Sequence, residues 1–466
     1  MKVLNTALLL PTLLALAASA PNPAQAQGPL TSNAPARRYS IQDVGSLSTD
    51  PSHGVRAFEI NNLGHVHGEN DLPAPAGQGK INAYWWNAHT QEKIYPIAPA
   101  LSFGGSVNDA GQCVGYSTTA LGDLHAHFWD SGMTQDVHVG PLSFSKATDV
   151  NVDALLCGTY SVFIPGYIVS QFRPYVGDTQ GNWLDIGTFG GGGGFAYALN
   201  DHMRVIGTAK DANESMRPFL WDPSTGMQDL GSLGGFTTPR DLDNFDRVVG
   251  MSANPAGEYR AFLWQAGGMI ELATLGGSAG DAKAINDHGV AVGNSTDAGG
   301  VQHATLWPAG TAGPVSLQDA IRPGTSWVLT GASGINELGE ICGTGKVNGV
   351  QRAYRLTPLV RGNRLSGAQP GISGRMNTLY GLGFEPGATI SVAHGFAPGR
   401  TAAAGCAGQF YAIQDAQILL STLANADGRI AVTFHLPSSL AGTQILVQAL
   451  DMGRCIMGEV RSQLLQ

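Results

Sequence analysis

The sequence contains little charge and no concentration of basic residues. Charged residues make up 13% of the 466 positions, and the formal net charge is −9. Basic clusters are what attract nucleic acids and anionic membrane surfaces, so we expect neither partner. Intrinsic disorder is also not expected, because it requires high charge together with an apolar content below the 43% found here.

Long apolar stretches are absent except at the N-terminus, so we expect no membrane insertion. The chain begins "MKVLNTALLLPTLLALAASAPNPAQAQ", in which Lys2 precedes an apolar core and Ala24-Gln25-Ala26 forms a cleavage pattern. This arrangement predicts a signal peptide over residues 1–26, followed by an N-terminal segment over 27–38. We therefore expect a secreted protein, extracellular or periplasmic, in an oxidising compartment.

Catalytic and cofactor motifs are also missing. The sequence has no G-x-S-x-G, no H-E-x-x-H and no Walker loop, and the glycine run "GTFGGGGGF" (187–195) is not followed by Lys-Ser or Lys-Thr. We therefore predict no cofactor, no metal and no catalytic residue. Two histidine pairs, His65 with His67 and His125 with His127, have spacing suited to zinc, but no third ligand accompanies them and their role stays open.

Glycine is abundant, at 64 residues, and part of it belongs to a motif that occurs seven times. The copies are "EINNLGHVHG" (59–68), "SVNDAGQCVG" (106–115), "DVNVDALLCG" (149–158), "ALNDHMRVIG" (198–207), "DLDNFDRVVG" (241–250), "AINDHGVAVG" (284–293) and "GINELGEICG" (334–343). Their closing glycines are separated by 43 to 50 residues. A repeat of this period is typical of a propeller or a solenoid.

Each repeat predicts four short strands, which is the content of one propeller blade. After the motif come elements such as "RAFLW" (260–264) and "DLGSLGG" (229–235). Within the motif, Asn, Asp and Gly predict a tight hairpin turn, because Asn and Asp bond nearby amides and Gly accepts positive φ. Three copies carry Ala154, Met203 or Asp246 in place of that glycine, so we expect their turns to differ. A calcium loop is disfavoured, since Val152 replaces one aspartate.

The two ends of the repeat region complement each other. Residues 39–47, "YSIQDVGSL", match a fourth strand but precede the first repeat, whereas the last repeat has no fourth strand of its own. We therefore predict an all-β fold: a seven-bladed β-propeller over 39–357, closed by the N-terminal strand so that no sheet edge stays exposed.

These elements resemble the HAF family of probable extracellular repeats. The resemblance is carried by "AINDHGVAVG", "RAFLW" and "DLGSLGG", and it covers residues 39 to about 357. Membership would imply export and a propeller-like fold. It would imply no defined reaction and no catalytic residues.

The remaining chain lacks the repeat motif and has a different pattern of apolar and polar residues. Residues 358–369 are interpreted as a linker, and 370–466 as a small antiparallel β-sandwich because apolar and polar residues mix between Gly and Pro turns. This part resembles C-terminal β modules that follow propellers in some secreted bacterial proteins. We expect Cys406 and Cys455 to form a disulfide. Cys113, Cys157 and Cys342 replace apolar residues within the repeat, so we expect them to be buried.

The most unusual loop belongs to the third repeat, "TYSVFIPGYIVSQF" (159–172). Exposed aromatic residues suit a sugar ring or the apolar anchor of a partner, although local packing is the alternative. The same ring face should carry the fourth repeat's polar loop. The binding residues predicted on this face are Tyr160, Phe163, Tyr167, Phe172, Asp211, Asn213 and Glu214.

Three functions stay open. The first is a secreted interaction module that binds an extracellular glycan or protein through this loop face without catalysis. The second is an extracellular polysaccharide lyase or hydrolase with its site near the propeller axis, for which Tyr197, His202 and Arg240 are conceivable residues. The third is a passive surface or matrix scaffold. The sequence does not determine the oligomeric state.

Overall fold

A computed structural model describes residues 38–45, 54–72, 80–94, 102–167, 169–310, 313–359 and 363–466. The predicted signal peptide and most of the segment before residue 38 lie outside this range. Strands dominate, and the described helices are the single turn α1 (Leu317–Ala320) and the 3-10 turn η2 (Ser438–Leu440). No described helix has the length and apolar character needed to cross a membrane.

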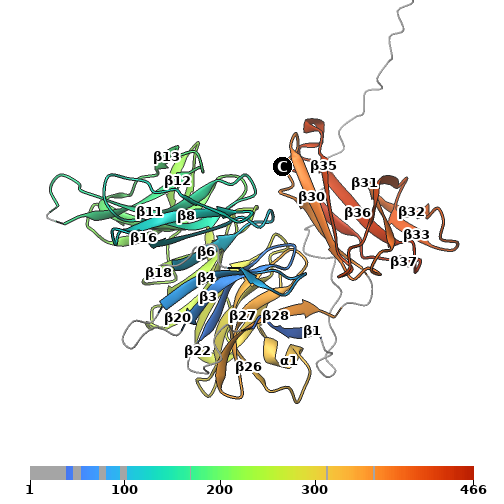
Figure 1. Ribbon diagram of the computed structural model, residues 1–466, viewed down its shortest axis with the longest axis horizontal. Coiled ribbons are helices and arrows are strands. Elements are labelled where there is room, and N and C mark those ends of the chain that lie inside the picture. The colour runs from blue at the N-terminus through green and yellow to red at the C-terminus, as the bar shows by residue number, and fades with distance from the viewer. Residues whose placement is uncertain are drawn as a thin grey trace, which may run out of the picture. The chain divides into compact units, whose positions relative to one another are not determined.

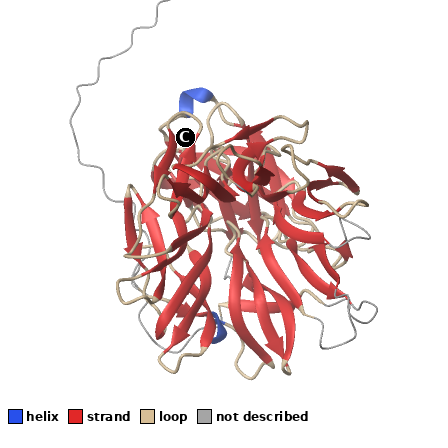
Figure 2. Ribbon diagram, turned by 90° about the vertical axis from the view of Figure 1, so that its left-hand side faces the viewer, coloured by secondary structure: helices blue, strands red, loops and turns tan. Residues whose placement is uncertain are grey.

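Seven four-stranded antiparallel sheets follow one another along the chain up to Pro358 (Figures 1 and 2). Sheet 1 has β2 (Val55–Ile60), β3 (Val66–Leu72), β4 (Lys80–Trp86) and β5 (Lys93–Ile94); sheet 2 has β6 (Ser102–Val107), β7 (Cys113–Thr118), β8 (Leu124–Asp130) and β9 (Met133–Asp136); sheet 3 has β10 (Ser145–Val150), β11 (Leu156–Val162), β12 (Gln171–Gly177) and β13 (Trp183–Asp185). Sheet 4 has β14 (Gly190–Leu199), β15 (Val205–Asp211), β16 (Met216–Asp222) and β17 (Gly226–Asp229); sheet 5 has β18 (Thr237–Leu242), β19 (Val248–Ala253), β20 (Tyr259–Gln265) and β21 (Gly268–Glu271). Sheet 6 has β22 (Gly276–Ile285), β23 (Ala291–Asp297), β24 (Gln302–Trp307) and β25 (Val315–Ser316); sheet 7 has β26 (Trp327–Ile335), β27 (Ile341–Val347), β28 (Val350–Pro358) and β1 (Tyr39–Asp43).

Sheet 7 combines the two ends of the repeat region. Strand β1 pairs antiparallel with β28, and the register places Tyr39 opposite Pro358 and Asp43 opposite Tyr354. This is the pairing that the unmatched N-terminal segment predicts. Successive four-stranded meanders of this kind are the units of a β-propeller.

The apolar core lies between neighbouring sheets. One cluster joins Tyr84 and Trp86 of sheet 1 to Cys342 and Ala353 of sheet 7, which are distant in sequence. Clusters of the same kind join sheets 4 and 5 and sheets 6 and 7. Each sheet therefore buries both faces against its neighbours, as propeller blades do.

The closing glycine of the repeat is required by close packing. A Cβ at Gly207 would lie 2.0 Å from the Phe195 carbonyl oxygen and 2.8 Å from the Phe219 ring, which belongs to the third strand of the same sheet. The closing glycines thus make room for a bulge in the first strand and an aromatic ring in the third.

The hairpin turns of the repeat are more uniform than the sequence predicts. Gly289 has φ +74°, and Ala154, Met203 and Asp246 have φ of 58°, 63° and 61°. All of these residues donate their amide to the carbonyl of the Asn or Asp three positions earlier. The expectation that turns without glycine differ is therefore wrong, because the preceding Asn or Asp side chain accepts the amides two and four residues later in these turns as well.

The C-terminal module begins earlier than expected. Residues 364–369, interpreted as linker, form strand β29, because Leu365 packs into the core and the Ser366 hydroxyl accepts the amide of Tyr380 at 2.9 Å. One sheet has β29 (Arg364–Gln369), β30 (Met376–Leu382) and β35 (Ile430–His435); another has β34 (Gln417–Leu423), β31 (Thr389–Gly395), β36 (Gln444–Asp451), β37 (Ile456–Met457) and β38 (Arg461–Leu464); a hairpin has β32 (Pro398–Ala402) and β33 (Phe410–Ile413). One core cluster contains residues of both larger sheets, which therefore pack face to face.

The cysteine predictions are confirmed. Cys406 and Cys455 form a disulfide across 49 residues of sequence. Cys113, Cys157 and Cys342 are unpaired and buried in the repeat region.

Candidate functional site

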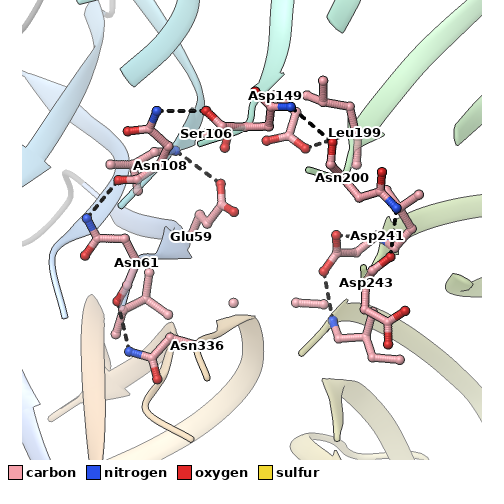
Figure 3. Close-up of a pocket in the computed structure, with 18 of the residues that line it drawn as sticks. Glu59, Asn61, Ser106, Asn108, Asp149, Leu199, Asn200, Asp241, Asp243 and Asn336 are labelled. Carbon is pink, nitrogen blue, oxygen red and sulfur yellow. Dashed lines mark hydrogen bonds between the residues drawn. The ribbon is translucent and has the colours of Figure 1, made fainter. Parts of the chain in front are cut away.

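The asparagine of the repeat motif joins neighbouring sheets around a ring. Its Oδ1 accepts amides two and four residues later, as in Asn61 with Leu63 at 3.1 Å and His65 at 2.9 Å, which closes the turn. Its Nδ2 donates to the equivalent carbonyl of the next sheet over 2.9–3.2 Å (Figure 3). These bonds run from Asn61 to Asn108, Asn108 to Asn151, Asn151 to Asn200, Asn200 to Asp243, Asn286 to Asn336, and Asn336 to Asn61.

The ring closes between sheets that are far apart in sequence. Asn336 of sheet 7 donates to the Asn61 carbonyl of sheet 1 at 2.9 Å, and the amide of Glu337 donates to Asn62 at 2.8 Å. In sheet 5 an aspartate replaces the asparagine, and Arg247 donates instead to the Asp287 carbonyl of sheet 6 at 2.7 Å. The motif therefore forms the turn and also connects the sheets.

The next residue of the motif forms a second layer of links. The amide of Asn62 donates to the Asp109 carboxylate at 2.8 Å, and the amide of Asp287 donates to Glu337 at 2.8 Å. These acidic side chains serve as inter-sheet acceptors, and Asp201 does the same for the amide of Val152 at 3.2 Å. Burial raises the pKa values of Asp109, Glu337 and Asp201, that of Asp201 to about 7.

A cavity of about 290 Å³ lies inside this ring and is lined by the first strands of all seven sheets. Three carboxyl groups, those of Glu59, Asp149 and Asp241, come from sheets 1, 3 and 5 and face the central space (Figure 3). Each accepts the amide of a residue in the following sheet: Val107 at 3.2 Å, Leu199 at 2.8 Å and Ile285 at 2.8 Å respectively.

These three groups hold protons more tightly than free carboxylic acids do. Burial raises the pKa of Asp149 to about 6 and that of Asp241 to about 8. Burial, with a smaller contribution from the nearby Asp149 charge, also raises the pKa of Glu59. Burial in the cavity thus favours the protonated form of each of these three acids relative to a free carboxylic acid.

These carboxyl groups are not among the residues predicted from the sequence. They occupy the position two residues before the motif asparagine, where the seven repeats carry Glu, Ser, Asp, Ala, Asp, Ala and Gly. Comparing this column across the repeats would have indicated the acids, because a residue at this position of the innermost strand is close to the axis.

Two of the three residues considered for an enzyme do line the cavity. Tyr197 bonds through its hydroxyl to the Thr208 hydroxyl at 2.8 Å, and Arg240 pairs with Asp281 at 3.2 Å. Lys283 also lines the cavity and pairs with the same Asp281 at 2.6 Å. His202 is not among the lining residues.

The C-terminal module covers the face of the propeller on which the motif turns lie. Leu63 and Leu338 of these turns pack with Tyr380 and Leu382 of the module. Polar contacts add Asp153 with Arg375 at 2.5 Å, the Asn244 carbonyl with Gln466 at 2.9 Å, and His89 with Asp427 at 2.8 Å. Gln369 of the module lines the cavity and bonds the Asp287 carboxyl.

One contact to the module is a buried ion cluster. Glu340 of sheet 7 is fully buried and accepts Arg355 of the same sheet at 2.6 Å and Arg429 of the module. Burial alone would raise the pKa of Glu340, but the two guanidinium groups outweigh it and lower the pKa to about 2. The carboxylate therefore stays charged at all physiological pH values.

The opposite face carries most of the exposed apolar residues of the propeller. The antiparallel order places the loops between second and third strands, and the connections between sheets, on this loop face. Exposed large side chains here come from five sheets: Leu121, Phe163, Val169, Phe172, Phe236, Tyr259, Val301 and Val328. The described loop face is thus an apolar rim, distributed around the ring rather than confined to one loop.

The predicted aromatic loop is only partly exposed. Phe163 is 64% exposed and Phe172 is 38% exposed, with the Phe172 ring against Phe144 and Phe195. The expectation that Tyr160 is exposed is wrong: it is 4% exposed, because its hydroxyl donates to Asp185 at 2.8 Å and its ring packs on Trp183. Its position in strand β11, rather than in the loop, explains the burial.

The loop is fixed to the neighbouring sheet through two other predicted residues. Tyr167 donates to the Glu214 carboxylate at 2.5 Å, and Glu214 also accepts Lys210 at 2.8 Å and the amide of Gly192 at 2.9 Å. Asp211 instead accepts amides of its own turn, that of Asn213 at 2.9 Å included, and Asn213 is exposed. The structure therefore brings Tyr167 and Glu214 together, and leaves Asn213 accessible.

The histidine pairs do not converge. His67 is buried, and its burial lowers the pKa to about 4; His65 has a pKa near 4 for the same main reason. His125 pairs with Asp136 at 2.7 Å, whereas His127 bonds Ser117 at 2.8 Å. Among the described residues, no three His, Cys, Asp or Glu side chains are arranged to hold a metal ion.

Comparisons with known proteins show distant structural likeness only. No family model matches the chain, and neither does any curated protein. An oligogalacturonate lyase from Vibrio parahaemolyticus is similar with a TM-score of 0.46 and 12% identity, covering 69% of this chain and 97% of that one. The β-propeller domain of the Trilobed protease from Pyrococcus furiosus has a TM-score of 0.46 and 8% identity over 65% and 93% of the two chains. TolB from Acinetobacter baumannii has a TM-score of 0.35 and 12% identity over 63% and 79%. These likenesses are too distant to bear on function.

Proposed function

We propose that this chain is an exported, non-catalytic interaction module that binds an extracellular protein through the loop face of a seven-bladed propeller. The seven four-stranded sheets are the blades, β1 closes the ring, and the C-terminal module is a β-sandwich. We also propose that the chain belongs to the HAF family of extracellular repeats. The disulfide between Cys406 and Cys455 is consistent with an oxidising compartment.

One observation carries this proposal: the turn face is covered by the chain's own module, whereas the loop face exposes apolar residues from five sheets. Exposed apolar side chains on the one face that the chain leaves uncovered favour an interaction site there. The rim contains aliphatic Leu121, Val169, Val301 and Val328 as well as aromatic rings. A protein partner uses both kinds of side chain, whereas a sugar needs an aromatic platform.

The test compares immobilised chains as baits for proteins exported by the producing cell. The loop-face variant carries Phe163→Ser and Val301→Ser, and the control carries Met133→Ser, an exposed apolar residue near the opposite face. We expect a partner that the wild type and the control retain and the loop-face variant loses. Retention by all three would refute the loop face as the site. Loop-face-dependent binding of a polysaccharide, without any protein, would keep the site but change the partner to a glycan.

A second candidate, an extracellular polysaccharide lyase or hydrolase, is favoured by the cavity. Tyr197 and Arg240 line it together with carboxyl groups of raised pKa, and perturbed acids gather at active sites. Against this, Arg240 and the Tyr197 hydroxyl are engaged by Asp281 and Thr208. Polymer cleavage that Asp241→Asn abolishes would establish the enzyme. Failure of the wild type on acidic and neutral polysaccharides, together with partner binding, would favour the interaction module.

A further inference from the structure

The three carboxyl groups of the cavity have no cationic partner. Among the described residues, none of Glu59, Asp149 and Asp241 forms an ion pair. The two cationic side chains of the lining, Arg240 and Lys283, are both directed to Asp281. Any of these three acids that is ionised therefore has no cationic side chain of the protein to neutralise it.

A polar group beside these acids is also unsatisfied. Ser106 lies on the sheet between those of Glu59 and Asp149, lines the cavity and is 3% exposed. Its hydroxyl approaches both carboxyl groups but makes no hydrogen bond of acceptable geometry with either. Buried hydroxyl groups without partners are rare in folded proteins and indicate a missing ligand or water.

We propose that the axial cavity binds a small organic cation, an ammonium group on a short carbon chain, between Glu59, Asp149 and Asp241 (Figure 3). The ammonium group donates to the three carboxylates, and the Ser106 hydroxyl accepts from it or from a second polar group of the ligand. Phe58 and Tyr197 line the same cavity and give the carbon chain an apolar wall. A bare metal ion needs oxygen ligands within about 2.6 Å, whereas the volume of about 290 Å³ suits a molecule of several heavy atoms.

Binding is coupled to proton release. Burial raises the pKa of Asp241 to about 8 and that of Asp149 to about 6, and it also raises the pKa of Glu59. A cation among them favours the ionised forms and expels protons. The other charged side chains of the lining are Lys283, Arg240, Asp109, Asp201, Asp243, Asp287 and Glu337, and Lys283 and Arg240 stay paired with Asp281. The buried thiols of Cys113 and Cys342 face Glu59, and that of Cys157 faces Asp149. Affinity should therefore rise between pH 6 and pH 9.

The experiment is isothermal titration calorimetry of the full chain with 1,4-diaminobutane, with 1,4-butanediol as the neutral analogue and calcium chloride as the metal probe. We expect saturable binding of the diamine, none of the diol, and heats that depend on the buffer's ionisation enthalpy because protons are released. The site is separate from the loop face, so this outcome does not depend on the proposed protein partner.

Variants decide whether the cavity is the site. Asp241→Asn keeps an oxygen acceptor for the Ile285 amide. It should weaken diamine binding by about tenfold or more, because the ligand loses one charge-assisted hydrogen bond. Ser106→Ala, which removes no existing bond, should weaken it a few-fold. Glu92→Gln, an exposed acid outside the cavity, should change nothing. Equal affinity of Asp241→Asn and wild type, binding of the diol as strong as that of the diamine, or binding of calcium alone would each overturn the proposal.

Discussion

Replacing Asn336 with alanine tests the ring of inter-sheet bonds at the point where it closes. The Asn336 side chain makes four hydrogen bonds: to the Asn61 carbonyl at 2.9 Å, to the Glu340 carboxylate at 2.9 Å, and from the amides of Leu338 at 3.1 Å and Glu340 at 2.9 Å. The side chain is 4% exposed, so water cannot replace these partners.

The expected loss follows from the groups left without partners. The amides of Leu338 and Glu340 lose their acceptor, whereas the Asn61 carbonyl keeps the Gly64 amide at 2.9 Å. Each unsatisfied buried group costs about 1–3 kcal/mol, so even at the lower limit the free energy of unfolding falls by about 2 kcal/mol. A loss of this size is large compared with the usual effect of single substitutions, about 1 kcal/mol.

Asn254 supplies a matched control. It closes a loop-face turn with the same pattern, accepting the amides of Ala256 at 3.0 Å and Glu258 at 3.0 Å, but it has no bond to a neighbouring sheet. Asn254→Ala should therefore cost about 1 kcal/mol, the value of a solvent-accessible local turn.

Urea unfolding followed by tryptophan fluorescence measures both variants. We expect a clearly lower midpoint for Asn336→Ala than for Asn254→Ala, with similar slopes. Equal midpoints would refute the argument, because they would show that the motif asparagine contributes only to its own turn.

The other predictions concern the disulfide, the thiols, the ion cluster and pH. Cys406→Ser should lower the free energy of unfolding by about 4 kcal/mol, the chain-entropy value for a loop of 49 residues, and a urea midpoint equal to that of the wild type would contradict this. Cys113, Cys157 and Cys342 are buried, so native chain should not react with a thiol reagent until it unfolds. Glu340→Ala leaves Arg355 and Arg429 facing each other without their carboxylate and should cost about 3–5 kcal/mol in urea unfolding, whereas the exposed Glu92→Gln should cost none. Burial raises the folded-state pKa of Asp201 to about 7 and that of Asp241 to about 8, from the ordinary aspartate value of 3.8. The stability that these protonated groups contribute is therefore full below about pH 4 and is lost as the pH rises through 8. The thermal midpoint should be higher at pH 5 than at pH 8.5, and the reverse order would exclude these two groups as the source of the pH dependence.

The sequence determined the repeat architecture well because each repeat carries its own turn chemistry. Seven copies of one motif predict seven similar hairpins, and the unmatched segment before the first copy predicts the pairing of β1 with β28. The prediction was wrong for Ala154, Met203 and Asp246, because the hydrogen bonds of the preceding Asn or Asp close the turn with positive φ whether or not the residue is glycine. Residues 364–369 were interpreted as a linker because Ser366 and Gln369 are polar. In the structure this segment is a buried strand, in which the Ser366 hydroxyl accepts the amide of Tyr380.

The candidate sites were only partly predictable. Tyr167 and Glu214 were selected and do meet, but Tyr160 lies within a strand and is buried. The apolar rim combines residues from loops of five sheets, and no single stretch of sequence reveals that combination. The cavity acids were missed for the same reason. Glu59, Asp149 and Asp241 occupy the same position in different repeats, and they lie close together only because the sheets form a closed ring.

Site-specific photo-crosslinking shows whether the loop face is the free interaction surface. A photoreactive phenylalanine analogue is placed at residue 163 or, as the control, at residue 133, and each chain is irradiated among the cell's exported proteins. We expect one discrete adduct from residue 163 and none from residue 133, because the two exposed side chains lie near opposite faces. An adduct from residue 133 alone, or none from either position, would contradict it.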